Sequence, residues 1–332
     1  MKEALFYRLI DEDKGIIQCL LCPKECKIKE NQVGFCRARK NIQNKLYSLI
    51  YGRISSWGMD PIEKKPLYHF FPGTTVLSLG TIGCNFSCSF CQNWTISQES
   101  IERVRVEELS PERAVELALK NHSPGISYTY SEPLIWYEYV LDTAKLARKN
   151  HLKNILVTNG FINPQPFQEL LPYIDALNID LKSFRDSFYR KYCQANLFPV
   201  LQTIDLAKSS AHVEITNLLI PGLNDGEEEV KELVDWIATR GKNIPLHFSR
   251  YFPSYRMNIE ATPLSTLYRA RDIAQKELKY VYLGNIWDEE ANNTYCGNCK
   301  RLLIRRTGYH IHNLGIDQQG RCKYCQEQVV CL

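Results

Sequence analysis

The chain has 332 residues, of which 44% are hydrophobic and 23% are charged, and its formal net charge is +4. This composition is ordinary for a globular protein, and so small a charge does not indicate a nucleic-acid partner. The sequence has neither an apolar run of membrane-spanning length nor a signal-peptide core near residue 1, so we expect a cytoplasmic protein with no membrane partner.

The cysteine content is the unusual feature, because the chain has 13 cysteines. Cytoplasmic thiols are kept reduced, so clustered cysteines indicate metal sites rather than disulfides. All but Cys193 and Cys331 fall into three groups, and we expect these two to be buried free thiols.

The first group lies in a predicted N-terminal module with its lead-in, residues 1–73. Its spacing is C-x2-C-x3-C-x9-C, formed by Cys19, Cys22, Cys26 and Cys36. So small a segment needs a metal to supplement its core. The short, uneven gaps resemble ferredoxin-type loops, but a small zinc site fits as well. We slightly favour zinc over a second iron–sulfur cluster, and either centre would have a structural or electron-relaying role.

The central segment, residues 74–290, alternates strand-like and helix-like patterns. β-branched or apolar runs predict strands at 75–79, 125–130, 154–159, 176–182, 212–220, 245–252 and 280–285. Helix start signals between them are Ser110 before Pro111, Pro133, Asp225 before an acidic turn, and Thr262 before Pro263.

This alternation predicts an α/β fold with right-handed crossovers and a parallel sheet. The segment is somewhat short for eight units, so we expect a partial, open (β/α)6 TIM-like barrel. A doubly wound sheet is the alternative, although no GxGxxG motif follows the first strand.

The second cysteine group follows the first predicted strand directly, at the end of a barrel where catalytic residues gather. Cys84, Cys88 and Cys91 have C-x3-C-x2-C spacing. Three thiolates can each hold one iron of a cubane and leave the fourth iron open for chemistry. A structural zinc site completed by a distant cysteine or histidine is the alternative.

This loop, with Phe90 just before its third cysteine, resembles the radical S-adenosylmethionine (radical SAM) signature. Much of the chain is similar to the AmmeMemoRadiSam-system radical SAM enzymes, a branch related to pyruvate formate-lyase activating enzymes; the similar stretches are 19–28, 34–41, 61–73, 80–94, 128–139, 157–162, 176–184, 218–225, 245–253 and 280–286. The resemblance implies a [4Fe-4S] cluster whose open iron binds S-adenosyl-L-methionine. Reductive cleavage then gives a 5′-deoxyadenosyl radical that abstracts hydrogen from a substrate the sequence does not identify.

The resemblance also implies cofactor-binding residues at the strand ends. Besides Phe90, Glu132 would accept hydrogen bonds from the methionine ammonium, although Thr129-Tyr130-Ser131 precedes it where most of the superfamily has glycines. Asn159 would meet the ribose or the carboxylate. A plain acid at a helix N-terminus is the alternative for Glu132.

Three charged or titratable residues on later strands complete the implied site. Asp180 and Lys182 resemble an Asp-x-Lys pair of the activating enzymes, with Lys182 contacting the cofactor carboxylate; a buried ion pair is the alternative. His247 would lie near the nucleoside, unless it is simply a core histidine. Glu214 stands where the activating enzymes carry an arginine, which argues against transfer of their substrate chemistry.

The third group lies in a predicted C-terminal module, residues 291–332. Cys296, Cys299, Cys322 and Cys325 form paired CxxC knuckles, as in a zinc ribbon. We expect Zn²⁺ there, with rubredoxin-like iron as the competing ion. Four thiolates satisfy one ion, so we expect His310 and His312 to be surface or packing residues.

The sequence also allows two other functions: a glycyl-radical-enzyme activase and a non-enzymatic zinc-binding adaptor. For an enzyme, the resemblance implies an external electron donor, flavodoxin or ferredoxin, and a functional link to Memo-family and AMMECR-family proteins.

Overall fold

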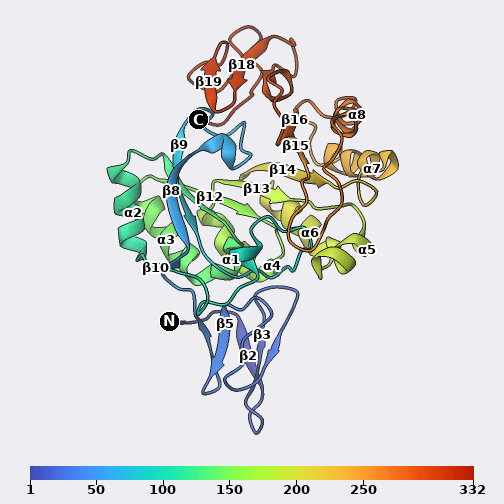
Figure 1. Ribbon diagram of the computed structural model, residues 1–332. Helices are drawn as coiled ribbons and strands as arrows, with labels where there is room; N and C mark the ends of the chain where they lie inside the picture. The colour runs from blue at the N-terminus through green and yellow to red at the C-terminus, as the bar shows by residue number, and fades with distance from the viewer.

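The computed structural model describes residues 1–332, and an eight-stranded sheet forms its centre (Figure 1). Seven strands are parallel: β9 (Thr75–Gly80), β11 (Gly125–Thr129), β12 (Lys153–Thr158), β13 (Ala176–Asp180), β14 (His212–Leu219), β15 (Leu246–Arg250) and β16 (Val281–Gly284). β8 (Ser56–Pro61) pairs antiparallel with β9 at one edge. All seven predicted strands are thus confirmed, and β8 is an addition.

The strand order decides between the two predicted architectures. The parallel strands neighbour one another in chain order, from β9 at one side to β16 at the other. A doubly wound sheet reverses its order at a switch point, so that alternative is wrong. β8 and β16 are the two free edges, which makes the sheet an open barrel, as expected.

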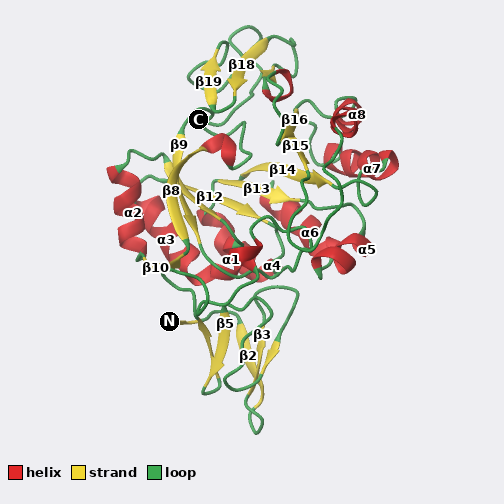
Figure 2. Cartoon of the chain, in the orientation of Figure 1, coloured by secondary structure: helices red, strands yellow, loops and turns green.

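Helices cover the outer face of the sheet (Figure 2). The α-helices are α1 (Trp94–Ser97), α2 (Pro111–Lys120), α3 (Tyr137–Lys149), α4 (Pro164–Leu170), α5 (Asp186–Phe188), α6 (Leu197–Ala207), α7 (Glu227–Ala238) and α8 (Leu264–Ala274). 3₁₀ turns span Ile62–Lys64, Pro133–Trp136, Leu171–Tyr173 and Glu290–Asn292, and a π-helical turn spans Tyr189–Cys193. The longest helix, α3, has 13 residues, too few to traverse a bilayer.

Not all of the predicted helix-capping residues act as caps in the structure. Ser110 caps α2 as expected, because its hydroxyl accepts a hydrogen bond from the Arg113 N–H at 3.2 Å. Thr262 is not a cap, and α8 begins at Leu264, after Pro263. The Thr262 hydroxyl instead donates to the Leu219 carbonyl at 2.6 Å and accepts from the Tyr251 N–H at 3.0 Å. Gly226 precedes α7, and Asp225 accepts from the Gly222 N–H at 2.7 Å.

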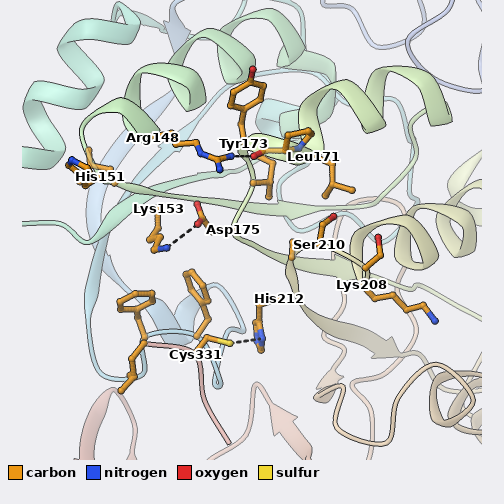
Figure 3. A pocket seen from close by; sticks show the side chains of 18 residues that line it. Arg148, His151, Lys153, Leu171, Tyr173, Asp175, Lys208, Ser210, His212 and Cys331 are labelled. Atoms are coloured by element: carbon orange, nitrogen blue, oxygen red, sulfur yellow. Dashed lines mark hydrogen bonds and ion pairs between the residues drawn. The ribbon is translucent and has the colours of Figure 1, made fainter. Parts of the chain in front are cut away.

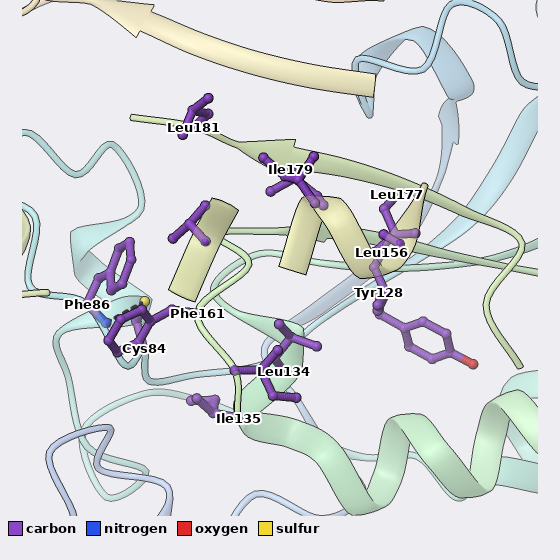
Figure 4. Packing of buried hydrophobic residues seen from close by; sticks show 14 of the residues in the cluster. Cys84, Phe86, Tyr128, Leu134, Ile135, Leu156, Phe161, Leu177, Ile179 and Leu181 are labelled. Carbon is purple, nitrogen blue, oxygen red and sulfur yellow. Dashed lines mark hydrogen bonds between the residues drawn. The ribbon is translucent and has the colours of Figure 1, made fainter. Parts of the chain in front are cut away.

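The two faces of the parallel strands differ in chemistry. Outward residues are apolar and pack under the helices, as Leu156, Leu177 and Ile179 do in Figure 4. Inward residues are buried yet often polar, for example Ser127 and Asn178. Because side chains alternate along a strand, one sequence pattern builds the core on one face and a polar interior on the other.

The terminal segments lie at opposite ends of the barrel (Figure 1). Residues 1–50 contain β1 (Lys2–Glu3), β2 (Tyr7–Asp11), β3 (Ile16–Cys19), β4 (Lys27–Ile28), β5 (Arg39–Ile42) and β6 (Lys45–Ser48); β7 (Arg53–Ile54) pairs with β10 (Glu107–Glu108). The segment meets the carboxyl ends of the strands, where the Asn163 N–H, beyond β12, donates to the Leu21 carbonyl at 3.0 Å.

The C-terminal strands lie near the amino ends of the parallel strands instead. They are β17 (Thr294–Tyr295), β18 (Leu302–Thr307) and β19 (His310–Asn313). The last residues return to the barrel, where the Cys331 N–H donates to the His69 carbonyl at 2.7 Å. The two terminal segments thus pack against different ends of the parallel strands.

Candidate active site

The loop after β9 carries Cys84, Cys88 and Cys91, with the first two buried and the third half-buried. Backbone contacts hold the loop from the far side. The Ser87 N–H donates to the Cys193 carbonyl at 3.0 Å, and the Ser89 N–H donates to the Tyr192 carbonyl at 2.9 Å. The loop is thus fixed by the π-helical turn at Tyr189–Cys193 as well as by the strand it follows.

All three loop cysteines line one cavity of about 250 Å³ at the carboxyl ends of the strands. The opposite wall is polar and comes from the ends of β11, β12 and β13. Five of the predicted site residues line the cavity: Phe90 beside the loop cysteines, and Glu132, Asn159, Asp180 and Lys182 on the polar wall. Residues from separate parts of the sequence thus line the same cavity, and three thiols form one side of it.

Glu132 is buried, and both of its carboxylate oxygens accept hydrogen bonds from neighbouring residues. Oε1 accepts from the Thr158 hydroxyl at 2.5 Å and from the Leu134 N–H at 3.0 Å, and Oε2 accepts from the Asn159 N–H at 2.8 Å. The Leu134 contact is a helix cap, as the alternative for this residue anticipated. A carboxylate has about four lone-pair sites, so one acceptor site remains for a ligand. Burial raises the pKa of Glu132 to about 7 despite these bonds.

Asp180 and Lys182 form an ion pair with 2.6 Å between Oδ2 and Nζ. The pair lines the cavity, so it is both the ion pair of the alternative interpretation and a group accessible to a ligand. Burial by itself would lower the pKa of Lys182, but the Asp180 carboxylate and the Cys88 sulfur outweigh it and raise the value. The ammonium therefore stays charged beside the thiols.

Asn159 connects the polar wall to the cysteine loop. Its Nδ2 lies 3.7 Å from the Cys84 sulfur and 2.9 Å from Oδ1 of Asn85. Its own Oδ1 accepts from the Phe161 N–H at 2.9 Å, which fixes the amide orientation. An amide N–H aimed at a thiolate stabilises the negative charge that a metal ligand must carry.

His247 does not line the cavity. Its Nε2 lies 2.7 Å from Oε2 of Glu214, and its ring stacks on Tyr282. By sheet register His247 pairs with Thr216, which does line the cavity, but Ser249 takes the place at cavity level on β15. Barrel strands are tilted, so residues paired by register lie at different depths. His247 is therefore a buried residue of the barrel interior, and its place near the nucleoside stays a prediction.

Glu214 also lies below the cavity. Its carboxylate accepts from the His69 N–H at 2.7 Å and lies 2.9 Å from Nε2 of His212. Burial by itself would raise the pKa of Glu214, but His212 and His247 outweigh it and hold the value well below its usual range. Glu214 is therefore a structural group of the barrel interior.

Two residues at the loop carried no sequence signal. The Ser97 hydroxyl lies 3.2 Å from the Cys91 sulfur. The Cys193 thiol is fully buried, as expected, but it lies beside Cys88 and raises the pKa of that thiol. Cys193 does not line the cavity, so no fourth thiol faces the open side of the loop. Only chain folding brings the π-helical turn of Cys193 to the loop.

A larger cavity, of about 1270 Å³, lies at the opposite end of the barrel (Figure 3). It contains none of the residues predicted for the site. Cys331 lines it with its sulfur 3.7 Å from Nδ1 of His212, and this thiol is exposed. The prediction of a buried Cys331 is therefore wrong, because the chain end rests on the surface through a single bridge to Phe70.

The C-terminal cysteines form a compact group with every pair of sulfurs within 4.8 Å; the group is Cys296, Cys299, Cys322 and Cys325. The Cys296–Cys325 and Cys299–Cys322 sulfurs are 3.5 and 3.7 Å apart. Four thiolates at a Zn–S distance of about 2.3 Å stand roughly 3.8 Å apart in a tetrahedron. The group can therefore hold one metal ion, and His310 and His312 are exposed, as expected.

Gly83, just before the first loop cysteine, is required by its surroundings. It has a φ of +82°, and a Cβ there would lie 2.4 Å from the Cys36 carbonyl oxygen. We expect Gly83→Ala to lower the free energy of unfolding by at least about 2 kcal/mol, from backbone strain and this collision. Anaerobic urea denaturation measures it. Gly222→Ala is the control, because Gly222 has a φ of +71° with open space around it. An equal loss in both variants would contradict the crowding at Cys36.

Comparison with known proteins agrees with this geometry. The model of the Radical SAM superfamily matches residues 79–237. The uncharacterized protein MJ0808 of Methanocaldococcus jannaschii is 45% identical over 334 residues, covering 99% of each chain. The pyruvate formate-lyase 1-activating enzyme of Escherichia coli K12 is 26% identical over 164 residues, 48% of this chain and 67% of that enzyme.

Among solved structures, Streptococcus suis SuiB superposes with a TM-score of 0.50 at 14% identity, over 63% of this chain and 50% of SuiB. This likeness concerns the fold alone. The sequence matches, the open barrel and the three-cysteine loop after its first strand lead to one conclusion: the chain belongs to the radical SAM superfamily and is a radical SAM enzyme, distantly related to the pyruvate formate-lyase activating enzymes.

Proposed function

We propose that the chain belongs to the AmmeMemoRadiSam branch and abstracts hydrogen from a substrate at the mouth of the barrel. One observation carries the proposal: three thiols and a polar wall of Glu132, Asn159, Asp180 and Lys182 enclose the same cavity. Family membership implies a [4Fe-4S] cluster and S-adenosyl-L-methionine, and the donor set fits both. When bound, the reduced cluster supplies the electron that cleaves the S–C5′ bond of the cofactor.

The cavity residues suit an amino-acid ligand attached to a nucleoside. The Lys182 ammonium attracts a carboxylate, and the free acceptor site of Glu132 suits an ammonium. The Asn159 amide supports the Cys84 thiolate. The apolar residues Phe86 and Phe90 help to keep water from the loop. Membership of the radical SAM superfamily makes the chain an enzyme and argues against the non-enzymatic zinc-binding adaptor.

The raised pKa of Glu132 gives a testable pH dependence. Below about pH 7 the carboxyl is mostly neutral and a poor partner for an ammonium. Affinity for S-adenosyl-L-methionine should therefore rise with pH, by roughly tenfold between pH 6 and pH 7.5. Anaerobic equilibrium binding measures it. In Glu132→Gln the affinity should be lower and flat across this range, and an unchanged slope in that variant would assign the titration to another group.

The central test is release of 5′-deoxyadenosine from S-adenosyl-L-methionine by anaerobically purified, dithionite-reduced protein. Brown protein that releases the nucleoside would support the proposal, and colourless protein containing only zinc would contradict it. The substrate can then be sought by mass spectrometry of cells from which the gene is deleted, as a modification or metabolite that disappears.

Similarity to pyruvate formate-lyase activating enzymes favours a second candidate, a glycyl-radical activase acting on a protein backbone. The two additional cysteine groups argue against it. Electron paramagnetic resonance of a candidate partner after reaction separates the two, since only an activase would leave a glycyl doublet.

We further propose zinc as the ion of the C-terminal cysteines, because their sulfurs have the spacing of one tetrahedral ion and paired CxxC knuckles are typical of zinc ribbons. Flavodoxin or ferredoxin is the proposed electron donor, and Memo-family and AMMECR-family proteins are the proposed functional partners. Metal analysis tests the first assignment, and turnover driven by each reduced donor in place of dithionite tests the second.

A further inference from the structure

The N-terminal cysteines surround a third cavity, smaller than the two described above. Cys19 ends β3, Cys22 and Cys26 lie in the turn between β3 and β4, and Cys36 lies in the segment before β5. All four line the same space, together with apolar residues such as Ile28 and Ile135. Cys19, Cys22 and Cys36 are buried and Cys26 is half-buried. Four thiols thus face one enclosed space from separate parts of the module.

The spacing of these thiols differs from that of the C-terminal group. Only the C-terminal cysteines have all their sulfurs within 4.8 Å of one another. The N-terminal four and the three loop cysteines stand farther apart, although each set lines a single cavity. One tetrahedral ion needs sulfurs roughly 3.8 Å apart, whereas a cubane binds each thiolate to a different iron and spreads them. The N-terminal group therefore resembles the iron–sulfur loop, not the single-ion site.

Polar contacts around this cavity suit bound thiolates. The Phe35 N–H donates to the Cys26 sulfur at 3.4 Å, and Nη1 of Arg39 lies 4.0 Å from the Cys19 sulfur. Arg39 is buried and paired with Glu138 on α3, which holds the guanidinium in place. N–H donors and cations near sulfur stabilise the reduced, more negative state of a cluster.

The module also touches the catalytic loop directly. The Cys36 carbonyl lies against Gly83, the residue before Cys84. Asn85, the residue after Cys84, lines the N-terminal cavity. Its Oδ1 accepts from Asn159, whose amide also contacts the Cys84 sulfur. Only a few bonded or hydrogen-bonded groups therefore separate the two sets of thiols.

We propose that Cys19, Cys22, Cys26 and Cys36 bind a second [4Fe-4S] cluster that relays electrons to the catalytic loop, an inference whose relay step rests on the proposed function above. A reduced ferredoxin or flavodoxin gives up one electron and is oxidised. The N-terminal cluster accepts this electron at the half-exposed Cys26 side, passes it on and returns to its resting state. The cluster on Cys84, Cys88 and Cys91 is reduced by one electron, and no atom is transferred.

The first test counts inorganic sulfide, which neither zinc nor a rubredoxin-like iron contributes. Reconstituted protein should contain about eight irons and eight acid-labile sulfides per chain, from two cubanes. The variant Cys84→Ser/Cys88→Ser/Cys91→Ser should keep about four of each and show the electron paramagnetic resonance signal of a reduced cubane. Loss of all sulfide from this variant, with an additional zinc, would overturn the proposal. The N-terminal module is unaltered in this variant, so its folding is not at issue.

The second test separates an electron relay from a structural cluster. In Cys22→Ser/Cys36→Ser, release of 5′-deoxyadenosine driven by reduced ferredoxin should fall at least tenfold, while dithionite, which is small, should still drive it. Equal losses with both reductants would refute the relay. If that variant does not fold, the two interpretations are separated by measuring how fast ferredoxin reduces each cluster of the wild-type protein. A relay requires the N-terminal cluster to be reduced first. Failure of the proposed function itself would differ, because no reductant would then release the nucleoside.

Discussion

Replacing Cys88 with alanine is expected to abolish release of 5′-deoxyadenosine while the C-terminal metal stays bound. Cys88 is one of three thiols at the cavity, and its loss leaves two ligands for a cluster that needs three. Enzymes accelerate reactions by about 10⁶-fold or more, so loss of the reacting centre should lower the rate by at least about 10³-fold. The measurement is anaerobic single-turnover assay of the nucleoside, with iron, sulfide and zinc determined on the same sample.

The design of this experiment must allow for Cys193, whose buried thiol lies beside Cys88 and could replace it as a ligand. The double variant Cys88→Ala/Cys193→Ala removes this possibility. Cys331→Ala is the matched control, because Cys331 is an exposed thiol at the other end of the barrel. Nucleoside release that persists in the double variant would contradict the assignment of the central loop.

Replacing Cys296 with alanine should have the largest effect on stability, and it should be local. A structural zinc contributes about 10–16 kcal/mol in peptide-sized modules, and three thiolates hold it far less tightly than four. The core that the metal supports is small: nine buried residues, which include Cys296, Leu303 and Cys322 and also Tyr280 and Tyr282 at β16. We therefore expect the variant to lose one metal ion and to become protease-sensitive after residue 290, while its cubane sulfide is retained.

His312→Ala serves as the control, since His312 is exposed and lies between the two knuckles without joining the thiol group. It should retain the metal and resist proteolysis. Metal analysis and limited proteolysis under anaerobic conditions measure both outcomes. A Cys296→Ala protein as protease-resistant as His312→Ala would show that packing on β16, and not the metal, holds the module.

Local patterns were enough to predict the seven parallel strands of the barrel. Strands such as 212–220 are β-branched and apolar, and the N-terminal signals of α2 act through a hydrogen bond three residues away. Thr262 and Asp225 carry similar signals and failed as caps, because their side chains found partners on strand ends or in a turn. A capping residue can be recognised in sequence, but whether a competing partner lies nearby is decided by the fold.

The sequence by itself determined the chemistry that depends on short spacing: the three-cysteine loop, each CxxC knuckle and the Asp180–Lys182 alternation are local, so chain geometry alone brings their side chains together. Only the tertiary structure decided what separate strands contribute. Strand tilt left His247 below the cavity, folding placed Cys193 behind Cys88, and the N-terminal thiols came to lie against Gly83. The physical reason is that such contacts depend on the stagger of the barrel strands and on how the terminal module docks. Both result from many packing interactions, so they produce no recognisable residue spacing in the sequence.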